Sequence, residues 1–192
     1  MLDPASKTSP WTDELTEDAA WTVASADDKV RRFIQTYLGP AQDSRATSGV
    51  PELVTLGQAA LESGWGEHAP RLNFFAIKAR ASDPPETRQL LRTVEILNGP
   101  DHVFPEIISI TKLPSGKYRY LVRDWFRAYP SAVAAFNAHG QVLRLPRYRA
   151  AFDHVDRPYR FAEEIAKGGY ATDPAYFDIL SAVMRSIENR LA

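Results

Sequence analysis

Residues 55–78 of this chain read TLGQAALESGWGEHAPRLNFFAIK, and they carry the strongest local signals in the sequence. The first nine residues have the composition and spacing of a helix that is apolar on most of its sides. Gly64 and Gly66 stop this helix, and Trp65 lies between them. The last six residues, NFFAIK, are strand-like around an apolar centre. The stretch therefore predicts a helix that ends at one carboxylate, Glu62, beside an aromatic turn.

The rest of the chain predicts an α+β protein, in which helices flank a small antiparallel sheet. Helical periodicity begins near Asp27 and stops at Gly39-Pro40, after which residues 41–49 have the composition of a polar loop. Further predicted helices cover residues 51–63, a segment from Ser131, residues 159–167, and a segment after Pro174 with a buried stripe of Phe177, Leu180, Met184, Ile187 and Leu191. Predicted strands cover residues 92–97, 107–111 and 118–123, the last two joined as a hairpin.

Composition excludes several classes of site. A chain of 192 residues with 44% hydrophobic residues is long enough for one domain with its own core. The absence of cysteine excludes disulfides, a thiolate nucleophile and a cysteine-based zinc site. The four histidines are dispersed, and the chain has no GxSxG elbow, GxGxxG motif or phosphate-binding loop. We therefore expect no metal, no cofactor and no nucleic-acid partner.

Charge is distributed unevenly along the chain. Residues 1–28 contain seven acidic residues and one lysine, whereas the remaining residues contain 22 basic and 17 acidic ones. This division predicts an acidic flexible leader over residues 1–28 and a folded domain over residues 29–192. The basic balance of the domain suits an anionic polymer, although ordinary solvated charge explains it equally well. The N-terminus lacks the pattern of a secretory signal, and no apolar run is long enough for a membrane span.

The position of Glu62 suits a proton donor. On the predicted helix, Thr55, Gln58 and Glu62 recur at helical spacing as a polar stripe that faces water or a cleft. The carbonyl end of the helix disfavours a negative charge on Glu62, and partial burial beside Trp65 would act on its pKa in the same upward direction. Taken alone, a solvated surface glutamate is the commoner explanation of such a residue.

Four blocks of sequence favour the proton donor over the solvated surface glutamate. They are QAALESGWG at residues 58–66, NFFAIKA at 73–79, WFRAYPS at 125–131 and GGYATDPAY at 168–176. In this order they resemble glycoside hydrolase family 73, the flagellar-type β-N-acetylglucosaminidases that cleave peptidoglycan. The resemblance extends from about Phe33 to the C-terminus and implies a lysozyme-like fold, mainly helical with a small antiparallel β-hairpin lobe. It places Glu62 in the position of the catalytic acid. Ala76 stands where the family usually has glycine, a departure that we expect to be tolerated.

The identity of a second carboxylate stays open. Glycosidases commonly pair two acids, and the resembled family has its second acid in a Thr-x-Glu-x-x-Asn-Gly context. Residues 93–99 (TVEILNG) match that pattern at Glu95. However, a second hairpin separates them from the block at Trp125, so Glu106 is a rival. The motif favours Glu95. If neither residue serves, the 2-acetamido group of the substrate could act as the nucleophile.

The resemblance also implies supporting residues around the acid. Tyrosine hydroxyls from the matched blocks would orient the sugar or a catalytic water, and aromatic rings would form apolar walls for it. An amide and an ammonium would bind acetamido or carboxyl groups, although a plain surface cation explains the lysine equally well. These candidates are Tyr170 as a catalytic residue, and Trp65, Asn73, Phe74, Lys78 and Tyr129 for substrate binding.

Through this resemblance the sequence predicts a hydrolase that cleaves the β-1,4 N-acetylglucosaminyl linkage of peptidoglycan glycan strands by carboxylate general-acid catalysis. One alternative is a lytic transglycosylase or muramidase of the same fold type, which cuts the alternate bond. Another is a non-catalytic wall-binding component of a phage tail or flagellar rod. The expected place of action is the periplasm or cell wall, reached by phage lysis or a dedicated export route. A secretion machine, phage or flagellar structure is a possible partner, and the oligomeric state is open.

Overall fold

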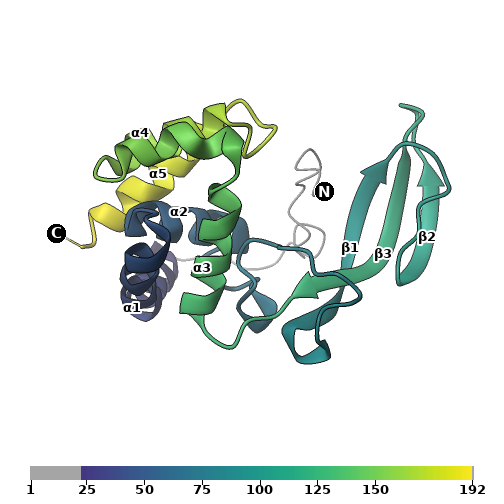
Figure 1. Cartoon of the computed structure of the whole chain (residues 1–192), viewed down its shortest axis with the longest axis horizontal. Coiled ribbons are helices and arrows are strands. Elements are labelled where there is room, and N and C mark those ends of the chain that lie inside the picture. Colours follow the sequence, from purple (N-terminus) through teal and green to yellow (C-terminus); the bar gives the residue numbers. More distant parts are fainter. Residues whose placement is uncertain (1–22, 192) are drawn as a thin grey trace.

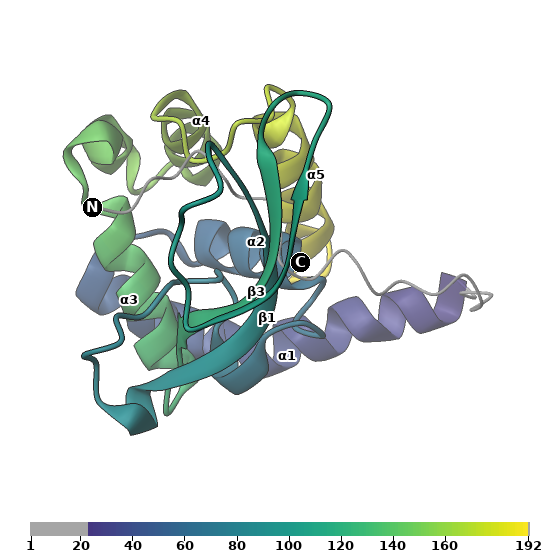
Figure 2. The ribbon, with the colours of Figure 1, turned by 90° about the vertical axis from the view of Figure 1, so that its right-hand side faces the viewer.

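The computed structural model describes residues 23–191, and these form a lobe of helices from which a small sheet projects (Figures 1 and 2). The helices are α1 (Val23–Ser48), α2 (Glu52–Ser63), α3 (Ala132–Leu143), α4 (Pro158–Lys167) and α5 (Tyr176–Glu188), with 3-10 turns at Pro70–Leu72, Pro85–Thr87 and Pro146–His154. The strands are β1 (Arg88–Leu97), β2 (Glu106–Lys112) and β3 (Tyr118–Arg127). This arrangement confirms the predicted α+β class.

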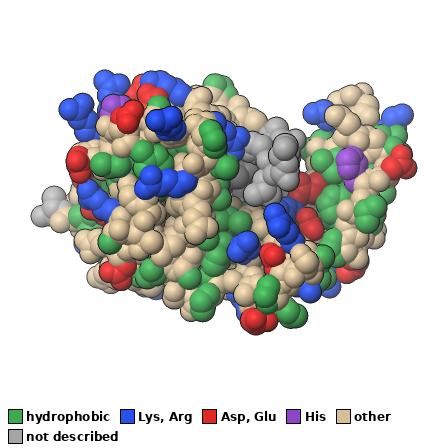
Figure 3. Space-filling view, in the orientation of Figure 1, with side chains coloured by type: hydrophobic (Ala, Val, Ile, Leu, Met, Phe, Trp, Pro, Cys, Tyr) green, Lys and Arg blue, Asp and Glu red, His purple; other side chains and the backbone are tan. Residues whose placement is uncertain are grey.

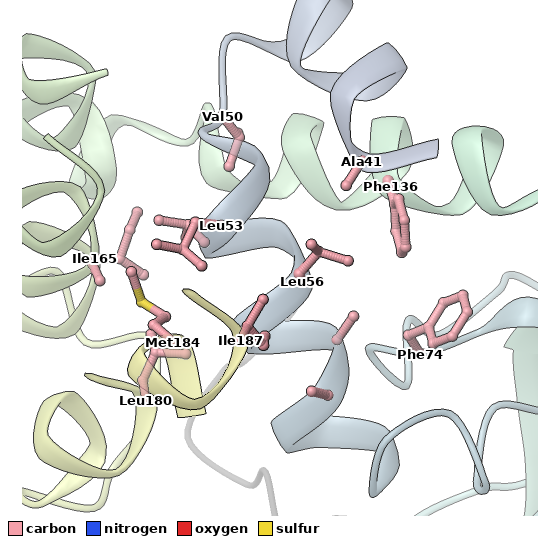
Figure 4. Packing of buried hydrophobic residues seen from close by; sticks show 14 of the residues in the cluster. Ala41, Val50, Leu53, Leu56, Phe74, Phe136, Ile165, Leu180, Met184 and Ile187 are labelled. Atoms are coloured by element: carbon pink, nitrogen blue, oxygen red, sulfur yellow. The ribbon is translucent and has the colours of Figure 1, made fainter. Parts of the chain in front are cut away.

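Helix α2 is the centre of the helical lobe. Nine of its 12 residues are buried, and it contacts α1, α4 and α5. Leu53 points toward the cluster from α4 and α5 on one side, and Leu56 points toward the other side, where Phe74 and Phe136 lie (Figure 4). Such a helix is apolar nearly all round because it has no solvent face. Its two ends are therefore the places where it reaches the surface.

Helix α1 is longer than the sequence predicts. It continues through Pro40 to Ser48, although proline removes a backbone hydrogen bond and crowds the preceding turn. Ala41 and Ser44 are fully buried beyond the proline, so the segment read as a polar loop is helical. Packing of this half of α1 against α3 outweighs the local cost of the proline. At the other end, residues 23–28 of the predicted leader form the first turns of α1, and the rest of that leader lies outside the described residues.

Two predicted helix faces differ from those observed. Thr55 and Gln58, which share the predicted polar stripe with Glu62, are 1% and 0% exposed and do not face a cleft. On α5, Phe177 is partly exposed and Leu191 lies beyond the helix with 44% exposure, whereas Leu180, Met184 and Ile187 are buried as predicted. The periodicity of the sequence identified the faces of these helices, but it did not show which of these faces the neighbouring elements cover.

The sheet has the strand order β1-β3-β2, and both pairings are antiparallel. Strand β1 begins four residues before the predicted strand, β3 ends four residues after it, and β2 is one residue longer at each end. Glu95 lies opposite Tyr120, and Leu91 lies opposite Asp124. Since directly paired residues share a face of a sheet, the side chains at these positions lie on one face. Among residues 23–191, no helix has the length and apolar content needed to cross a membrane.

The contact between α1 and α3 gives the first prediction. A Cβ added at Gly140 would lie 2.5 Å from the Cβ of Ser48, which belongs to the backbone-proximal part of α1 and cannot rotate away. We expect Gly140→Ala to destabilise the domain by about 1–3 kcal/mol, despite the better helix propensity of alanine. Urea unfolding measures this change. Gln141→Ala, on the exposed side of the same helix, is the control and should stay within about 0.5 kcal/mol of the parent. An equal effect of both substitutions would contradict the close approach.

Candidate active site

Glu62 lies in the last turn of α2, where this buried helix emerges, and its side chain is partly exposed. The helix ends at Gly64, which adopts the left-handed conformation and donates its N–H to the carbonyl of Ala60. Trp65 follows with a positive φ of 64°. Its ring meets Phe33 of α1 edge-to-face at 5.6 Å. The glycine-flanked turn thus places Trp65 three residues after Glu62, with its ring packed on α1.

Two buried tyrosines lie in the electric field of Glu62. Tyr170 and Tyr176 come from the segment between α4 and α5 and from the start of α5, and their rings stack at 5.5 Å. Burial first, and then the nearby charge of Glu62, raise the pKa of each phenol well above its ordinary value. Both tyrosines are therefore protonated at neutral pH and each carries an O–H dipole close to the acid.

Each of these hydroxyls has a buried polar partner. Gln58, one turn before Glu62 on α2, donates from Nε2 to the Tyr176 hydroxyl at 2.8 Å. His139 of α3 lies with Nε2 3.0 Å from the Tyr170 hydroxyl. The family resemblance predicts that Tyr170 contacts the sugar or a catalytic water, but its side chain is only 1% exposed. Tyr170 therefore lies beneath the surface.

A cluster of three charged groups lies on the sheet. The ammonium of Lys78 is 2.8 Å from Oε1 of Glu95 on β1 and 2.7 Å from Oδ2 of Asp124 on β3. It also lies 4.2 Å from the centre of the Phe126 ring, a cation–π distance. Lys78 was predicted to bind substrate groups or to be a plain surface cation. It instead pairs with two carboxylates that share one face of the sheet.

Glu95 and Glu106 lie on opposite faces of this sheet. Glu106 of β2 is paired with Arg123 of β3, which is in turn paired with Arg92 of β1. Arg92 and Glu95 are three residues apart on one strand, so their side chains point to opposite sides. Glu106 is also half-exposed and lies 3.7 Å from the Arg123 guanidinium. Only Glu95 therefore shares the face that carries Lys78 and Asp124.

Asn73 and Phe74, predicted to touch substrate, are buried instead. The amide of Asn73 is fully buried and bonds both the N–H and the carbonyl of Ile77. Phe74 is also fully buried, with its ring 4.9 Å from Tyr37 and 5.3 Å from Phe136. The apolar and amide residues of this motif shape the chain and do not line a binding surface.

Trp65 and Tyr129 are the partly exposed aromatic residues among the predicted substrate contacts. Burial raises the pKa of the Tyr129 phenol to about 12, and its hydroxyl has no hydrogen-bond partner among residues 23–191. Ala76 has a positive φ of 49°, a conformation that costs alanine roughly 1 kcal/mol and glycine nothing. The family glycine at this position thus has a conformational reason, and this chain accommodates the strain.

The molecular surface is hollowed between the helical lobe and the strands (Figure 3). Within the described residues, no three histidine, aspartate or glutamate side chains are placed to hold a metal ion. Sequence reasoning did not single out His139, and it placed Gln58 on a stripe facing water or a cleft instead of in a buried hydrogen bond. The signal available for both was an amide or imidazole within an otherwise apolar helical stretch.

The charged cluster on the sheet gives the second prediction. Lys78→Met removes the cation and leaves Glu95 and Asp124, with side chains 13% and 21% exposed, as neighbouring anions. We expect a loss of about 1–3 kcal/mol in unfolding free energy, measured by urea denaturation. Lys167→Met is the matched control, because Lys167 also pairs with two glutamates but is 57% exposed. Its substitution should change the unfolding free energy far less, because exposed ion pairs contribute little. Similar losses for the two variants would mean that the Lys78 cluster is merely superficial.

Comparison with known proteins agrees with this geometry. The family described as glucosaminidase, mannosyl-glycoprotein endo-β-N-acetylglucosaminidase, matches residues 39–189. Peptidoglycan hydrolase FlgJ of Pseudomonas aeruginosa is 32% identical over 174 residues, covering 86% of this chain and 38% of the relative. A probable N-acetylmuramidase of Lactococcus lactis subsp. lactis is 26% identical, covering 88% and 36%. The chain thus spans less than half the length of these relatives.

Solved structures extend the likeness to the fold. The glycoside hydrolase domain of Salmonella typhimurium FlgJ superposes with a TM-score of 0.62 at 28% identity, covering 84% of this chain and 90% of that one. A peptidoglycan hydrolase mutant from Sphingomonas sp. A1 gives 0.60 at 29% identity, covering 84% and 97%. These matches confirm the lysozyme-like fold and the resemblance drawn from the four sequence blocks. The chain belongs to the glucosaminidase family, glycoside hydrolase family 73.

Proposed function

We propose that this domain hydrolyses the β-1,4 N-acetylglucosaminyl linkage of peptidoglycan glycan strands, with Glu62 as the general acid. The observation that carries the proposal is the position of Glu62 in the last turn of a buried helix, just before the turn that carries Trp65, where its charge acts on two buried, protonated tyrosines. A carboxyl in such a place donates its proton to the glycosidic oxygen as the C–O bond breaks. Relatives named peptidoglycan hydrolase support the substrate class.

Glu95 is the second carboxylate in this proposal. Its salt bridge with Lys78 suits it to act as an anion, either activating water or stabilising the oxocarbenium-like transition state. Lys78 and Asp124 hold the Glu95 side chain in place on the sheet. Glu106 has no part in the mechanism because it lies on the other face with Arg123. If Glu95 proves dispensable, the 2-acetamido group of the substrate takes the nucleophilic role.

The second candidate function is cleavage of the alternate bond, as a muramidase or lytic transglycosylase. The relative named probable N-acetylmuramidase favours keeping this candidate. Either activity places the domain at the cell wall or in the periplasm, and the relatives named FlgJ make a flagellar setting one possible context. A wall-binding component without turnover is the remaining alternative, and the glutamate variants below separate it from both enzymes.

Digestion of purified peptidoglycan followed by mass spectrometry of the products distinguishes the bond that is cut. We expect new reducing ends on N-acetylglucosamine, because Glu62 would protonate the oxygen that leaves this sugar. Reducing ends on N-acetylmuramic acid would establish a muramidase instead. Anhydromuramic ends would establish a lytic transglycosylase. Absence of any cleavage by the folded parent protein would leave the wall-binding alternative.

Three isosteric variants test the proposed residues. Glu62→Gln should lower the rate of peptidoglycan clearing by about 100- to 10,000-fold, because it removes the proton donor without changing the shape of the site. Glu95→Gln should also lower the turnover rate strongly. Glu106→Gln is the matched control, a glutamate of the same sheet on the opposite face, and should keep the parent rate. Full activity of Glu62→Gln would refute the assignment of the acid.

A further inference from the structure

His139 is buried in α3 without an evident structural need for an imidazole. Its side chain is 1% exposed, and the other buried residues of α3 are non-polar: Ala135, Phe136, Gly140 and Leu143. The ring stacks on Phe75 with centroids 3.7 Å apart and planes inclined by 9°. An apolar side chain of similar size would fill this space without the cost of burying a polar group. The imidazole therefore has a use that packing alone does not supply.

The hydrogen bond of His139 indicates what the imidazole is used for. Nε2 of His139 lies 3.0 Å from the hydroxyl of Tyr170, and the stack on Phe75 prevents the imidazole plane from turning. Tyr170 is itself buried, next to the charge of Glu62. His139 and Tyr170, from two separate segments, are thus joined by a hydrogen bond, and the charge of Glu62 on a third segment acts on the Tyr170 phenol. The two buried residues make no contact with solvent and hence none with a glycan.

We infer that His139 is a positioning residue for the reaction, which fixes the Tyr170 hydroxyl beside the Glu62 carboxyl. The inference rests on the proposed role of Glu62 as the general acid. When Glu62 passes its proton to the glycosidic oxygen, it becomes a carboxylate, and an O–H dipole held nearby stabilises that charge without having to reorient. His139 acts only through Tyr170 and touches neither substrate nor the reacting atoms.

The second tyrosine indicates which tautomer of His139 is needed. Gln58 donates its amide N–H to Tyr176, so the Tyr176 oxygen accepts a bond and its own proton is left for another acceptor. The same arrangement at Tyr170 requires the proton of His139 on Nε2, donated to the Tyr170 oxygen. Both tyrosine O–H groups then stay available on the side of Glu62. The Nε2–H tautomer is thus part of the inference.

Substitution of His139 by methionine and by glutamine forms a matched pair. The two side chains have similar length and shape, but only glutamine carries an N–H that can reach the position of Nε2. We expect His139→Met to lower kcat about 10- to 100-fold with KM little changed, because the substrate does not touch this residue. His139→Gln should recover most of the lost rate. Equal losses in both variants, or a loss confined to KM, would overturn the inference.

A double-mutant cycle tests whether His139 acts through the Tyr170 hydroxyl. Tyr170→Phe removes only that hydroxyl, and the combination His139→Met with Tyr170→Phe should be no slower than Tyr170→Phe alone. Multiplied losses would show that His139 acts by another route. Tyr159→Phe is the control, since it removes a hydroxyl bonded to Glu188 away from the site, and it should leave kcat unchanged.

Two further measurements keep the test decisive. Nitrogen-15 NMR of the imidazole in the parent protein should show Nε2 protonated and Nδ1 unprotonated at neutral pH, and the reverse tautomer would contradict the donor role without any appeal to activity. If His139→Met does not fold, the comparison of His139→Gln with Tyr170→Phe carries the cycle. A dead Glu62→Gln together with a fully active His139→Met would refute this inference alone. An active Glu62→Gln would refute the proposed function on which it rests.

Discussion

Burial of α2 is the constraint on which the rest of the structure depends. Nine of its 12 residues are enclosed by other helices and by Phe74, so the helix has little freedom to slide or rotate. A carboxylate in the middle of this helix would be buried without solvent, at a large cost in free energy. At the last turn it emerges partly exposed, held by a helix whose position is fixed on all sides. The burial of nine residues of α2 thus fixes the position of the helix end that carries Glu62.

The polar residues within this buried helix follow from the same constraint. Gln58 cannot reach water, so its amide must find a partner in the protein, and it bonds the hydroxyl of Tyr176. His139 meets the same requirement on α3 through Tyr170. Helices α2 and α3 therefore satisfy their buried polar groups at one stacked pair of tyrosines, on which the charge of Glu62 also acts. The same two hydrogen bonds that satisfy the buried side chains of Gln58 and His139 also orient the two tyrosines.

Sequence reasoning reached the fold class, most element positions and the place of Glu62, because periodicity and glycine stops are local signals. It failed at Pro40, where local rules end a helix that tertiary packing of Ala41 and Ser44 continues. It also read a polar stripe through Thr55 and Gln58 as surface, since periodicity identifies a face but not what covers it. The second acid was undecided for a similar reason. Only the pairing of Arg123 with both Arg92 and Glu106 reveals which side of the sheet each glutamate occupies.

The two carboxylates belong to different lobes, and residues 73–79 connect these lobes. At one end of this segment Phe74 is packed between Tyr37 and Phe136 in the helical core. At the other, the backbone of residues 77–79 hydrogen-bonds along the end of β3, and the Lys78 side chain holds Glu95. The buried Asn73 side chain ties the two ends together through Ile77. The short motif NFFAIKA therefore has a mechanical role, because it fixes the sheet that carries Glu95 relative to the helix that carries Glu62.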